Sequence, residues 1–550
     1  MKERTKCFLG SIIIVFILLC CSVEGVYAAV YYVKNGGAKT SGASIPDNWE
    51  NMNCYRNIQT AIDAMAGGDE VIVDDGTYYL EDGNFINDKN FVAVPSGISR
   101  NNFTVVRAKN RLKVRLQNKG GLNYYDSIAY LTGKYIQVDG FVGVLSDTNY
   151  PPTMFDIGGS YNKITNCIGV RKGVADNYTS VISLRGSYNL AEDCAATGHS
   201  RYLFFTGGPD STDQYNIFRR CIARTDYSDS NQPMAGFSFY GNNGGTNTNN
   251  MIFQNCFAID GHQMNTGYGV YSYAWGGFYF PKNAYQAKIQ GCIVLNQDSQ
   301  YGGFSPLEAG GGEISIEHSV SWGNYDSSAP GTGEALNLRG SGSGIHVGHC
   351  TFGGSDNAIT NGNSGIASTK TLTNNLFWKN SNIGRVGTWG IQSYNAFFPL
   401  GQSLGSNSVT ADTLSYIVRV ESGSSMAASA SDGKDIGARI VKRYGAAGSF
   451  FGEAGYDLLQ DGSNGQGDVN LWPWPNEDMI KTIFSEPNPP NTGAVPITNN
   501  TTRGFCATGA RLDGKSPITL TSYVWEYLGN PIPTEIYMSA SPTIKAIKIQ

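Results

Sequence analysis

The sequence predicts an all-β solenoid, a parallel β-helix, and three observations lead to this prediction. The first is a short phrase of one apolar residue, two polar residues, a cysteine and a small apolar run, which recurs along the chain. The cysteine slot is filled by Cys167, Cys194, Cys221, Cys256, Cys292 and Cys350, and by Ser319 and Asn375 in two further copies. The steps between these positions are 27, 27, 35, 36, 27, 31 and 25 residues, which is typical of stacked repeats.

The second observation is an alternating apolar segment ahead of most phrases, and the third is the lack of long helical runs between them. Phe155–Ile157 and Val181–Leu184 are examples of these segments, and a Gly, Ser or Asn turn follows most of them. Alternation with a period of two indicates β-strands. Three short strands per repeat, stacked about 4.8 Å apart, predict a parallel β-helix rather than a helical solenoid.

The cysteine slot is predicted to hold buried free thiols that form an internal ladder. Ser319 and Asn375 fill the same slot, so the slot selects size and shape rather than a covalent bond. Disulfides between neighbours in the ladder are disfavoured by their geometry, and zinc is disfavoured because no cysteine pair has the close spacing of a metal site. Cys54 and Cys506 lie outside the ladder and are the better candidates for a disulfide.

Residues 1–28 have the organisation of a secretory signal peptide. Lys2, Arg4 and Lys6 precede an apolar run over 12–19, and the small residue Ala28 ends a cleavage site. The apolar run is short for a membrane span. We therefore expect a secreted, extracellular protein, with a lipoprotein anchored at Cys20 or Cys21 as the alternative.

The β-helix is predicted to occupy residues 29–400, with a capping helix near its start. A strand over Val30–Val33 comes first, and Asn57–Met65 has helix spacing, with Ile58, Ala61, Ile62 and Met65 on one face. A strand over Val71–Val73 follows. A helix at this place would cover the open end of the first coil and its unpaired backbone edge.

The repeated phrase fades after residue 400, and residues 401–550 are predicted to form an irregular capping region with short helices. Asn476, followed by Glu477 and Asp478, indicates a capped helix start. A second short helix is predicted over Thr521–Leu528. The alternative for this region is an aromatic carbohydrate-binding platform at Trp472 and Trp474.

The N-terminal motifs resemble those of the right-handed parallel β-helix superfamily, which includes the pectate-lyase-like enzymes. The motifs are Ile58-Gln-x-Ala-Ile-Asp-Ala, a segment from Gly68 to Tyr78, and Gly133–Phe141. The region after residue 400 resembles the tail of uncharacterised secreted bacterial β-helix repeat proteins. The resemblance covers about residues 30–400 and implies a right-handed coil. The motifs of polygalacturonases, of the main pectate lyase family and of pectin methylesterases are absent.

Charge and composition narrow the class of partner. The net charge is −5, the charged fraction is 15%, and 69 of the 550 residues are glycine. An acidic chain without basic runs is not expected to bind nucleic acid, and no apolar run after the signal is long enough to span a membrane. An extracellular polysaccharide is the expected partner, and the oligomeric state stays open.

Lyase-type β-elimination on an acidic polysaccharide is the leading functional hypothesis. Such an enzyme needs a base and a cation that neutralises the sugar carboxylate. We expect the site on the outer face of the strand before the turn, where alternation points Asp156, Ser183, Phe204, Ser238, Tyr279 and Asn337 outward. The class alternative is a non-catalytic cell-surface or matrix protein that binds glycans.

The candidate site residues come from these strands and from the loops that flank them. The catalytic candidates are Arg201, Arg224, His262 and Lys282; the substrate-binding candidates are Arg185, Tyr240, Tyr271, Trp275 and Tyr279; and the candidate calcium ligands are Asp226, Asp229 and Asp260. Calcium prefers several oxygen ligands, and aromatic faces suit sugar rings. The structural alternatives are solvated loop charges, a hydrogen-bonded loop histidine and aromatic cover for the side of the stack.

Overall fold

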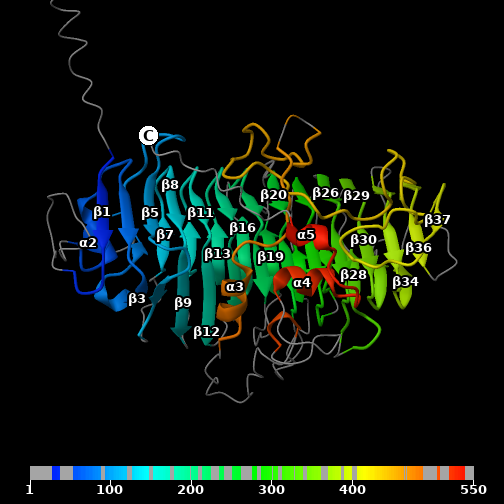
Figure 1. Cartoon of the computed structure of the whole chain (residues 1–550), viewed down its shortest axis with the longest axis horizontal. Coiled ribbons are helices and arrows are strands. Elements are labelled where there is room, and N and C mark those ends of the chain that lie inside the picture. Colours follow the sequence, from blue (N-terminus) through cyan, green and yellow to red (C-terminus); the bar gives the residue numbers. More distant parts are fainter. Residues whose placement is uncertain are drawn as a thin grey trace, which may run out of the picture.

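The structure is a computed structural model, and it describes most of the chain after the N-terminal segment. The described residues are 28–37, 54–87, 93–119, 127–147, 153–173, 179–198, 200–207, 213–224, 234–240, 250–261, 275–280, 286–299, 301–306, 313–326, 329–338, 344–360, 370–385, 389–398, 405–463, 465, 467–486, 504–507 and 519–538. Three parallel sheets, which we name A, B and C, run side by side along the long axis (Figure 1). The parallel β-helix predicted from the repeats, with the right hand that the resemblance implies, is confirmed.

The strands of each sheet come from successive coils. Sheet A contains β1 (Val30–Val33), β2 (Glu70–Val73), β5 (Thr104–Ala108), β8 (Ile136–Asp139), β11 (Lys163–Thr165), β14 (Leu190–Glu192), β17 (Ile217–Arg219), β20 (Met251–Gln254), β23 (Ala287–Gln290), β26 (Glu313–Glu317), β29 (Gly344–Gly348), β32 (Thr371–Thr373) and β35 (Ile391–Ser393). Sheet B contains β3 (Gly76–Tyr79), β6 (Val114–Gln117), β9 (Phe141–Asp147), β12 (Ile168–Gly173), β15 (Ala195–Gly198), β18 (Ile222–Arg224), β21 (Phe257–Ile259), β24 (Ile293–Leu295), β27 (Val320–Trp322), β30 (Thr351–Gly353), β33 (Leu376–Trp378), β36 (Ala396–Phe398) and β37 (Val409–Thr410). Sheet C contains β4 (Ile86–Asn87), β7 (Ala129–Leu131), β10 (Phe155–Ile157), β13 (Ser180–Leu184), β16 (Tyr202–Gly207), β19 (Met234–Tyr240), β22 (Trp275–Tyr279), β25 (Phe304–Ser305), β28 (Glu334–Asn337), β31 (Asn357–Thr360) and β34 (Asn382–Arg385).

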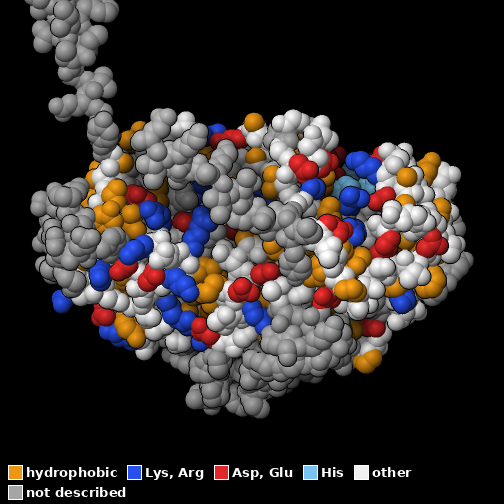
Figure 2. Space-filling view, viewed as in Figure 1, with side chains coloured by type: hydrophobic (Ala, Val, Ile, Leu, Met, Phe, Trp, Pro, Cys, Tyr) orange, Lys and Arg blue, Asp and Glu red, His pale blue; other side chains and the backbone are white. Residues whose placement is uncertain are grey.

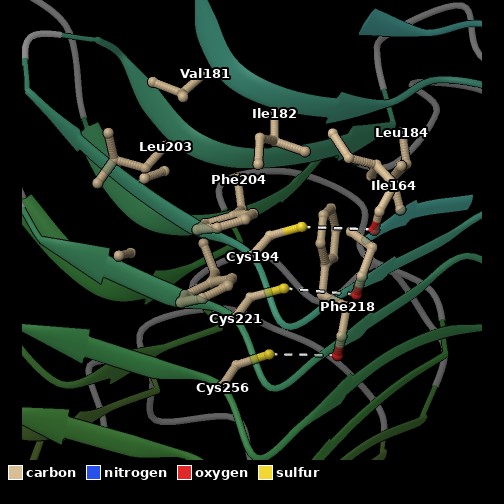
Figure 3. Packing of buried hydrophobic residues seen from close by; sticks show 14 of the residues in the cluster. Ile164, Val181, Ile182, Leu184, Cys194, Leu203, Phe204, Phe218, Cys221 and Cys256 are labelled. Atoms are coloured by element: carbon tan, nitrogen blue, oxygen red, sulfur yellow. Dashed lines mark hydrogen bonds between the residues drawn. The ribbon is translucent and has the colours of Figure 1, made fainter. Parts of the chain in front are cut away.

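The cysteine slot lies at the bend between sheets A and B. Figure 3 shows the sulfur atoms of Cys194, Cys221 and Cys256 above one another in the core. The Sγ of Cys194 donates to the backbone oxygen of Ile164 at 3.5 Å, and that of Cys256 donates to Phe218 at 3.3 Å. All six slot cysteines are buried and free, and no disulfide joins Cys54 and Cys506 in the described part of the chain. Burial raises the pKa of the Cys167, Cys194, Cys221, Cys256 and Cys350 thiols. The ladder of buried thiols is confirmed.

Ser319 and Asn375 continue the ladder with a side-chain oxygen in place of the sulfur. The Oγ of Ser319 accepts from the backbone nitrogen of Cys292 at 3.1 Å, and the Oδ1 of Asn375 accepts from that of Cys350 at 2.9 Å. A residue with positive φ precedes each slot, such as Asp193 at 56° and His318 at 48°. The slot therefore tolerates any small side chain that satisfies the backbone at this bend.

A second ladder, which the sequence analysis missed, lies at the turn between sheets C and A. The backbone nitrogen of Asn162 donates to the Oδ1 of Asn189 at 2.9 Å, and that of Asn189 donates to Asn216 at 2.8 Å. The tyrosine before each asparagine has positive φ. The Tyr161 and Tyr188 rings stack at 4.8 Å between centroids. The signal was a Tyr-Asn pair that recurs in three successive coils.

The predicted capping helix is confirmed as α2 (Ile58–Ala64) at the N-terminal end of the coils. The Oδ1 of Asn57 accepts from the backbone nitrogen of Thr60 at 3.0 Å and caps the helix. Ile58, Ala61 and Ile62 are fully buried in the core. The helix packs against β1 and β4, which are the end strands of sheets A and C, and against β2, the second strand of sheet A.

The sequence predicts that the C-terminal region forms a cap. In the structure, the described part of this region lies along the side of the coils. It contains α3 (Glu477–Phe484), a 3-10 turn (Gly504–Cys506), α4 (Leu520–Trp525) and α5 (Thr534–Met538). Figure 1 shows this orange-to-red part of the chain across the strands of earlier coils. Its apolar side chains pack on the outer face of sheet B, and Phe450 packs on the outer face of sheet A.

The aromatic platform considered for Trp472 and Trp474 is wrong. Both side chains are only 3% exposed. Their ring centroids lie 5.5 and 4.4 Å from that of Phe257, which projects from the outer face of sheet B. The Nε1 of Trp472 donates to the backbone oxygen of Ile440 at 2.7 Å. These residues anchor the C-terminal region and are closed to a sugar chain.

Candidate functional site

The outer face of sheet C is the face that the described C-terminal region leaves uncovered. Among the described residues, no hydrogen bond, ion pair or aromatic contact joins residues 405–538 to a strand of this sheet. Strand register places Asp156, Ser183, Phe205, Ser238 and Tyr279 side by side on this outer face. The sequence analysis selected the same face as the candidate cleft.

One outward position was predicted wrongly. Phe204 pairs in register with Ile182 and Phe237, and all three are fully buried in the core between the sheets. Figure 3 shows Phe204 among the core side chains. The outward residue of this strand is Phe205, since a shift of one residue moves a side chain to the opposite face of a strand.

Arg185 and Asp156 form the polar centre of this face. The Nε of Arg185 donates to the Oδ1 of Asp156 at 2.6 Å, and Nη2 also donates to Oδ2. Asp156 is 5% exposed, whereas the Arg185 side chain is 45% exposed. The Nη1 of Arg185 makes no hydrogen bond to a described residue. The guanidinium is therefore fixed along one edge and open along another.

Asp213 completes the polar cluster and was missed by the sequence analysis. It is 4% exposed and lies beside both Arg185 and Asp156. Burial, together with the negative charge of Asp156, raises the pKa of the Asp213 carboxyl to about 8, against the opposing effects of a backbone hydrogen bond from Gly207 and the Arg185 cation. The carboxyl is thus mostly protonated at neutral pH. No repeat or motif marks this residue in the sequence.

An aromatic cluster adjoins this polar centre on the outer face. It contains Tyr202, Phe205, Tyr279 and Tyr301 around Ala235. The Tyr202 and Phe205 rings stack at 5.0 Å, and the Cζ of Arg201 lies 5.0 Å from the Tyr202 ring centroid. Tyr279 is 6% exposed and Tyr240 is half-buried. Arg185, Arg201, Tyr240 and Tyr279 are thus brought to one face, with Tyr279 inside the cluster rather than on an open platform.

Arg224 and Asp260 lie elsewhere, beneath the C-terminal region beside sheet B. Both side chains are 0% exposed, and the Nε of Arg224 lies 3.1 Å from the Oδ2 of Asp260. The backbone nitrogen of Phe505 donates to the same oxygen at 2.7 Å. Asn296 and the Tyr523 hydroxyl donate to Oδ1.

This geometry does not fit the predicted roles of base and calcium ligand. A polymer cannot reach a fully buried pair, and the carboxylate oxygens of Asp260 are already occupied by protein donors next to a cation. Calcium needs several free oxygens. Within the described ranges, no group of three or more His, Cys, Asp or Glu residues is placed to hold a metal ion. We therefore assign Arg224 and Asp260 to anchoring the C-terminal region.

The remaining candidates fall where the structure gives no description. His262, Lys282, Tyr271, Asp226 and Asp229 lie outside the described residues. The backbone of Trp275 begins β22 in sheet C. The roles predicted for these six residues stay predictions. In the part of the chain that is described, no helix has the length and apolar character needed to cross a membrane.

Comparison with known proteins finds likeness of fold. No model of a protein family matches the sequence, and no curated protein matches it. Similar solved structures include the PL6 family polysaccharide lyase Pedsa3628 from Pseudopedobacter saltans, at 14% identity over 62% of this chain and 77% of that chain, with a TM-score of 0.42. Pectate lyase Pel9A is 16% identical over 76% and 98% of the two chains, with a TM-score of 0.45. XylC in complex with xylose is 10% identical over 69% and 86%, with a TM-score of 0.44. The likeness assigns no function to this chain.

Proposed function

We propose that this protein is secreted and binds an extracellular acidic polysaccharide along the outer face of sheet C. The observation that supports the proposal is the fixed, half-open guanidinium of Arg185. Its pairing with Asp156 holds the side chain in place, while Nη1 stays available to a ligand. Planar arginine donors suit a carboxylate better than a lysine does, because they bind both of its oxygens. A uronate carboxylate is the group that fits this edge.

The spacing of the two arginines on this face favours a polymer over a single sugar. Ser180 pairs with Tyr202 and Leu184 pairs with Thr206, so Arg201 and Arg185 lie at opposite ends of neighbouring strands. The six-residue separation corresponds to a distance on the order of 20 Å along the strand direction. One sugar cannot contact both cations, whereas two carboxylated units of one chain can.

β-Elimination is the reaction that we propose for the bound polymer. A base removes the proton on the carbon next to the carboxyl group, a double bond forms to the neighbouring carbon, and the glycosidic C–O bond at that carbon breaks. The leaving oxygen then takes up a proton. Arg185 would neutralise the carboxylate, and His262 or Lys282 remains the predicted base.

Binding without cleavage is the second candidate function. On the described part of this face the cations are arginines, and the guanidinium group keeps its proton in proteins. A face that holds a carboxylate without a free base would bind the polymer and leave it intact. The two candidates predict the same affinity and differ only in the product.

The test measures affinity and product together. Purified protein is incubated with pectate, alginate and chondroitin, with and without calcium, and unsaturated product is followed by its absorbance while affinity is measured by calorimetry. We expect Arg185→Gln to weaken binding about tenfold or more, consistent with the loss of a charge-assisted hydrogen-bond pair. Arg185→Lys should restore only part of it.

Lys119→Gln is the matched control, because Lys119 is a half-exposed cation paired with Asp82 outside sheet C. It should bind like the unchanged protein. Binding without product from the whole panel would assign the protein to the non-catalytic class. No binding to any acidic polymer, or equal binding by the Arg185→Gln variant, would overturn the proposal. Dependence on calcium would direct attention to Asp226 and Asp229.

A further inference from the structure

A pocket of about 370 Å³ lies elsewhere on the molecule, between the bend from sheet A to sheet B and the C-terminal region. The side chains that matter in it are His318, His349, Lys434, Arg439, Lys442 and Asp461. Figure 2 shows histidine side chains next to Lys and Arg side chains on this side of the molecule. The volume falls within the range of small-molecule sites. Two segments more than 80 residues apart in the sequence form its walls.

The two histidines occupy equivalent positions in successive coils. Each directly precedes the slot residue of its repeat and has positive φ, 48° for His318 and 52° for His349. Their rings consequently stack, with 4.8 Å between centroids and 18° between planes. Sequence analysis missed them because it considered histidines in loops, and these two belong to the repeated phrase itself.

Both ring nitrogens of His349 lie within hydrogen-bonding distance of protein groups. Its Nδ1 lies 3.1 Å from the backbone oxygen of Asp435, which can only accept, so Nδ1 carries the proton. Its Nε2 lies 3.1 Å from the Nδ2 of Asn374, which donates to it. Both ring nitrogens therefore have partners in the protein, and the Oδ2 of Asp432 also lies 3.5 Å from Nε2. His349 supports the stack rather than serving a ligand.

His318 is the open member of the pair. Its imidazole makes no hydrogen bond to a described residue. Burial lowers the pKa of His318 to about 3, with further lowering by His349 and Lys434. A neutral imidazole offers one donor and one acceptor. The pocket thus presents a ring that can bond a hydroxyl group in either direction.

Two cationic side chains at the pocket, Arg439 and Lys434, lie beyond hydrogen-bonding distance of their nearest carboxylates. The Arg439 side chain is 62% exposed and lies 3.6 Å from the nearest oxygen of Asp435. The Lys434 side chain is 68% exposed and lies 3.7 Å from Asp432. Both distances exceed a hydrogen bond. Lys442 differs, because Asp468 and Asn470 already bind its Nζ. Arg439 and Lys434 can therefore turn toward an anion in the pocket.

We propose that this pocket binds a small hydroxylated carboxylate, such as a single uronic acid. Arg439 and Lys434 would hold the carboxylate, and His318 would bond a hydroxyl group of the same molecule. The site lies at the bend from sheet A to sheet B, whereas the proposed polymer site lies on sheet C, so the two are separate surfaces. The stacked rings give the pocket a rigid wall, which suits recognition of a rigid sugar ring.

The five histidines of the chain make the pocket directly observable. Histidine ring signals are recorded by NMR in protein labelled at the imidazole carbons, and D-galacturonate, D-galactose and acetate are titrated separately. The signal of His318, assigned with the His318→Asn variant, should shift and saturate with D-galacturonate. We expect affinity for D-galacturonate to exceed that for D-galactose or acetate about tenfold or more.

Arg439→Gln is the decisive variant, because its exposed side chain can be changed without disturbing the core. It should weaken D-galacturonate binding about tenfold, while Lys119→Gln should not. Equal shifts with acetate, equal affinity in the Arg439→Gln variant, or no saturation at all would overturn the proposal. Arg185→Gln should leave these shifts intact, so failure of the polymer site and failure of this pocket give different results.

Discussion

The Arg185 cluster shows how burial sets the charge of the surface that we propose to bind an acidic polymer. With Asp213 protonated, Arg185 and Asp156 form a neutral pair whose open edge is a donor. With Asp213 ionised, the same cluster carries a net negative charge and repels a carboxylated polymer. The raised pKa of Asp213 therefore separates a binding state from a repelling state.

Polymer binding should weaken as the pH rises through about 8, the pKa of Asp213. The reason is the negative charge that Asp213 then adds beside Arg185. Affinity for pectate is measured by calorimetry at constant ionic strength between pH 6 and pH 9. Asp213→Asn should remove the alkaline decline. An identical decline in that variant would show that another group is responsible.

The same residue should leave a signature in stability. The pKa of Asp213 is higher in the folded protein than its ordinary value of 3.8, so the folded state holds the proton more tightly. Its contribution is fully present below pH 4 and is lost as the pH rises toward 8. In urea unfolding followed by circular dichroism, Asp213→Asn should flatten this part of the profile by a few kcal/mol. A parallel profile in both proteins would contradict the assignment.

The outward-facing residues of the candidate site could be predicted where apolar and polar residues alternate along a strand. Asp156 and Tyr279 were placed on the correct face because apolar residues flank each of them. The segment Leu203-Phe204-Phe205 has no polar residue to show which side chain points outward. The prediction therefore chose Phe204 instead of Phe205. Arg224 and Asp260 resembled surface charges, because their buried surroundings come from residues 504–525, far along the chain.

At the scale of the element, the two ladders fix where each coil bends. The cysteine ladder closes the bend from sheet A to sheet B, and the asparagine ladder closes the turn from sheet C to sheet A. Both satisfy backbone groups of the neighbouring coil inside a core that water does not reach. The fold could be predicted from the sequence because each equivalent bend needs the same kind of residue, which therefore recurs along the chain.

The cysteine slot should accept serine far better than leucine. Ser319 fills the slot naturally and is fully buried, so Cys221→Ser is expected to cost about 1 kcal/mol of unfolding free energy. Cys221→Leu adds volume to a packed ladder and is expected to cost about 1–3 kcal/mol. Urea unfolding measures both values. A larger cost for serine than for leucine would contradict a slot selected by size.

At the scale of the whole molecule, the C-terminal region joins coils that do not touch one another. Glu486 binds Arg115 at 2.6 and 2.7 Å and Lys172 at 3.2 Å. The carboxylate of Asp260 accepts hydrogen bonds from the backbone nitrogen of Phe505 and from the Tyr523 hydroxyl. Such contacts produce no repeated pattern in the sequence, because each of them is made only once in the molecule. The position of the region along the coils was therefore beyond sequence analysis.

Removing Asp260 should destabilise the protein much more than removing Glu486. Asp260→Ala removes a carboxylate that pairs with the fully buried Arg224 cation, which is expected to cost about 3–5 kcal/mol. Glu486→Gln acts on a pair whose side chains are 26% exposed and should cost about 1 kcal/mol or less. Thermal and urea unfolding measure both. Comparable losses in the two variants would contradict the anchoring role of Asp260.

The route of the C-terminal region also has a kinetic consequence. The repeated slot residues of successive coils lie 25–36 positions apart. The contacts of Phe505 with Asp260 and of Glu486 with Arg115 join residues 245 and 371 positions apart. Because chain closure over long separations is slow, the coils are expected to assemble first and the tail to dock last. Until it docks, the apolar strip on sheet B stays open to water and to other chains. Docking of the described C-terminal region thus determines when a newly made molecule stops being prone to association.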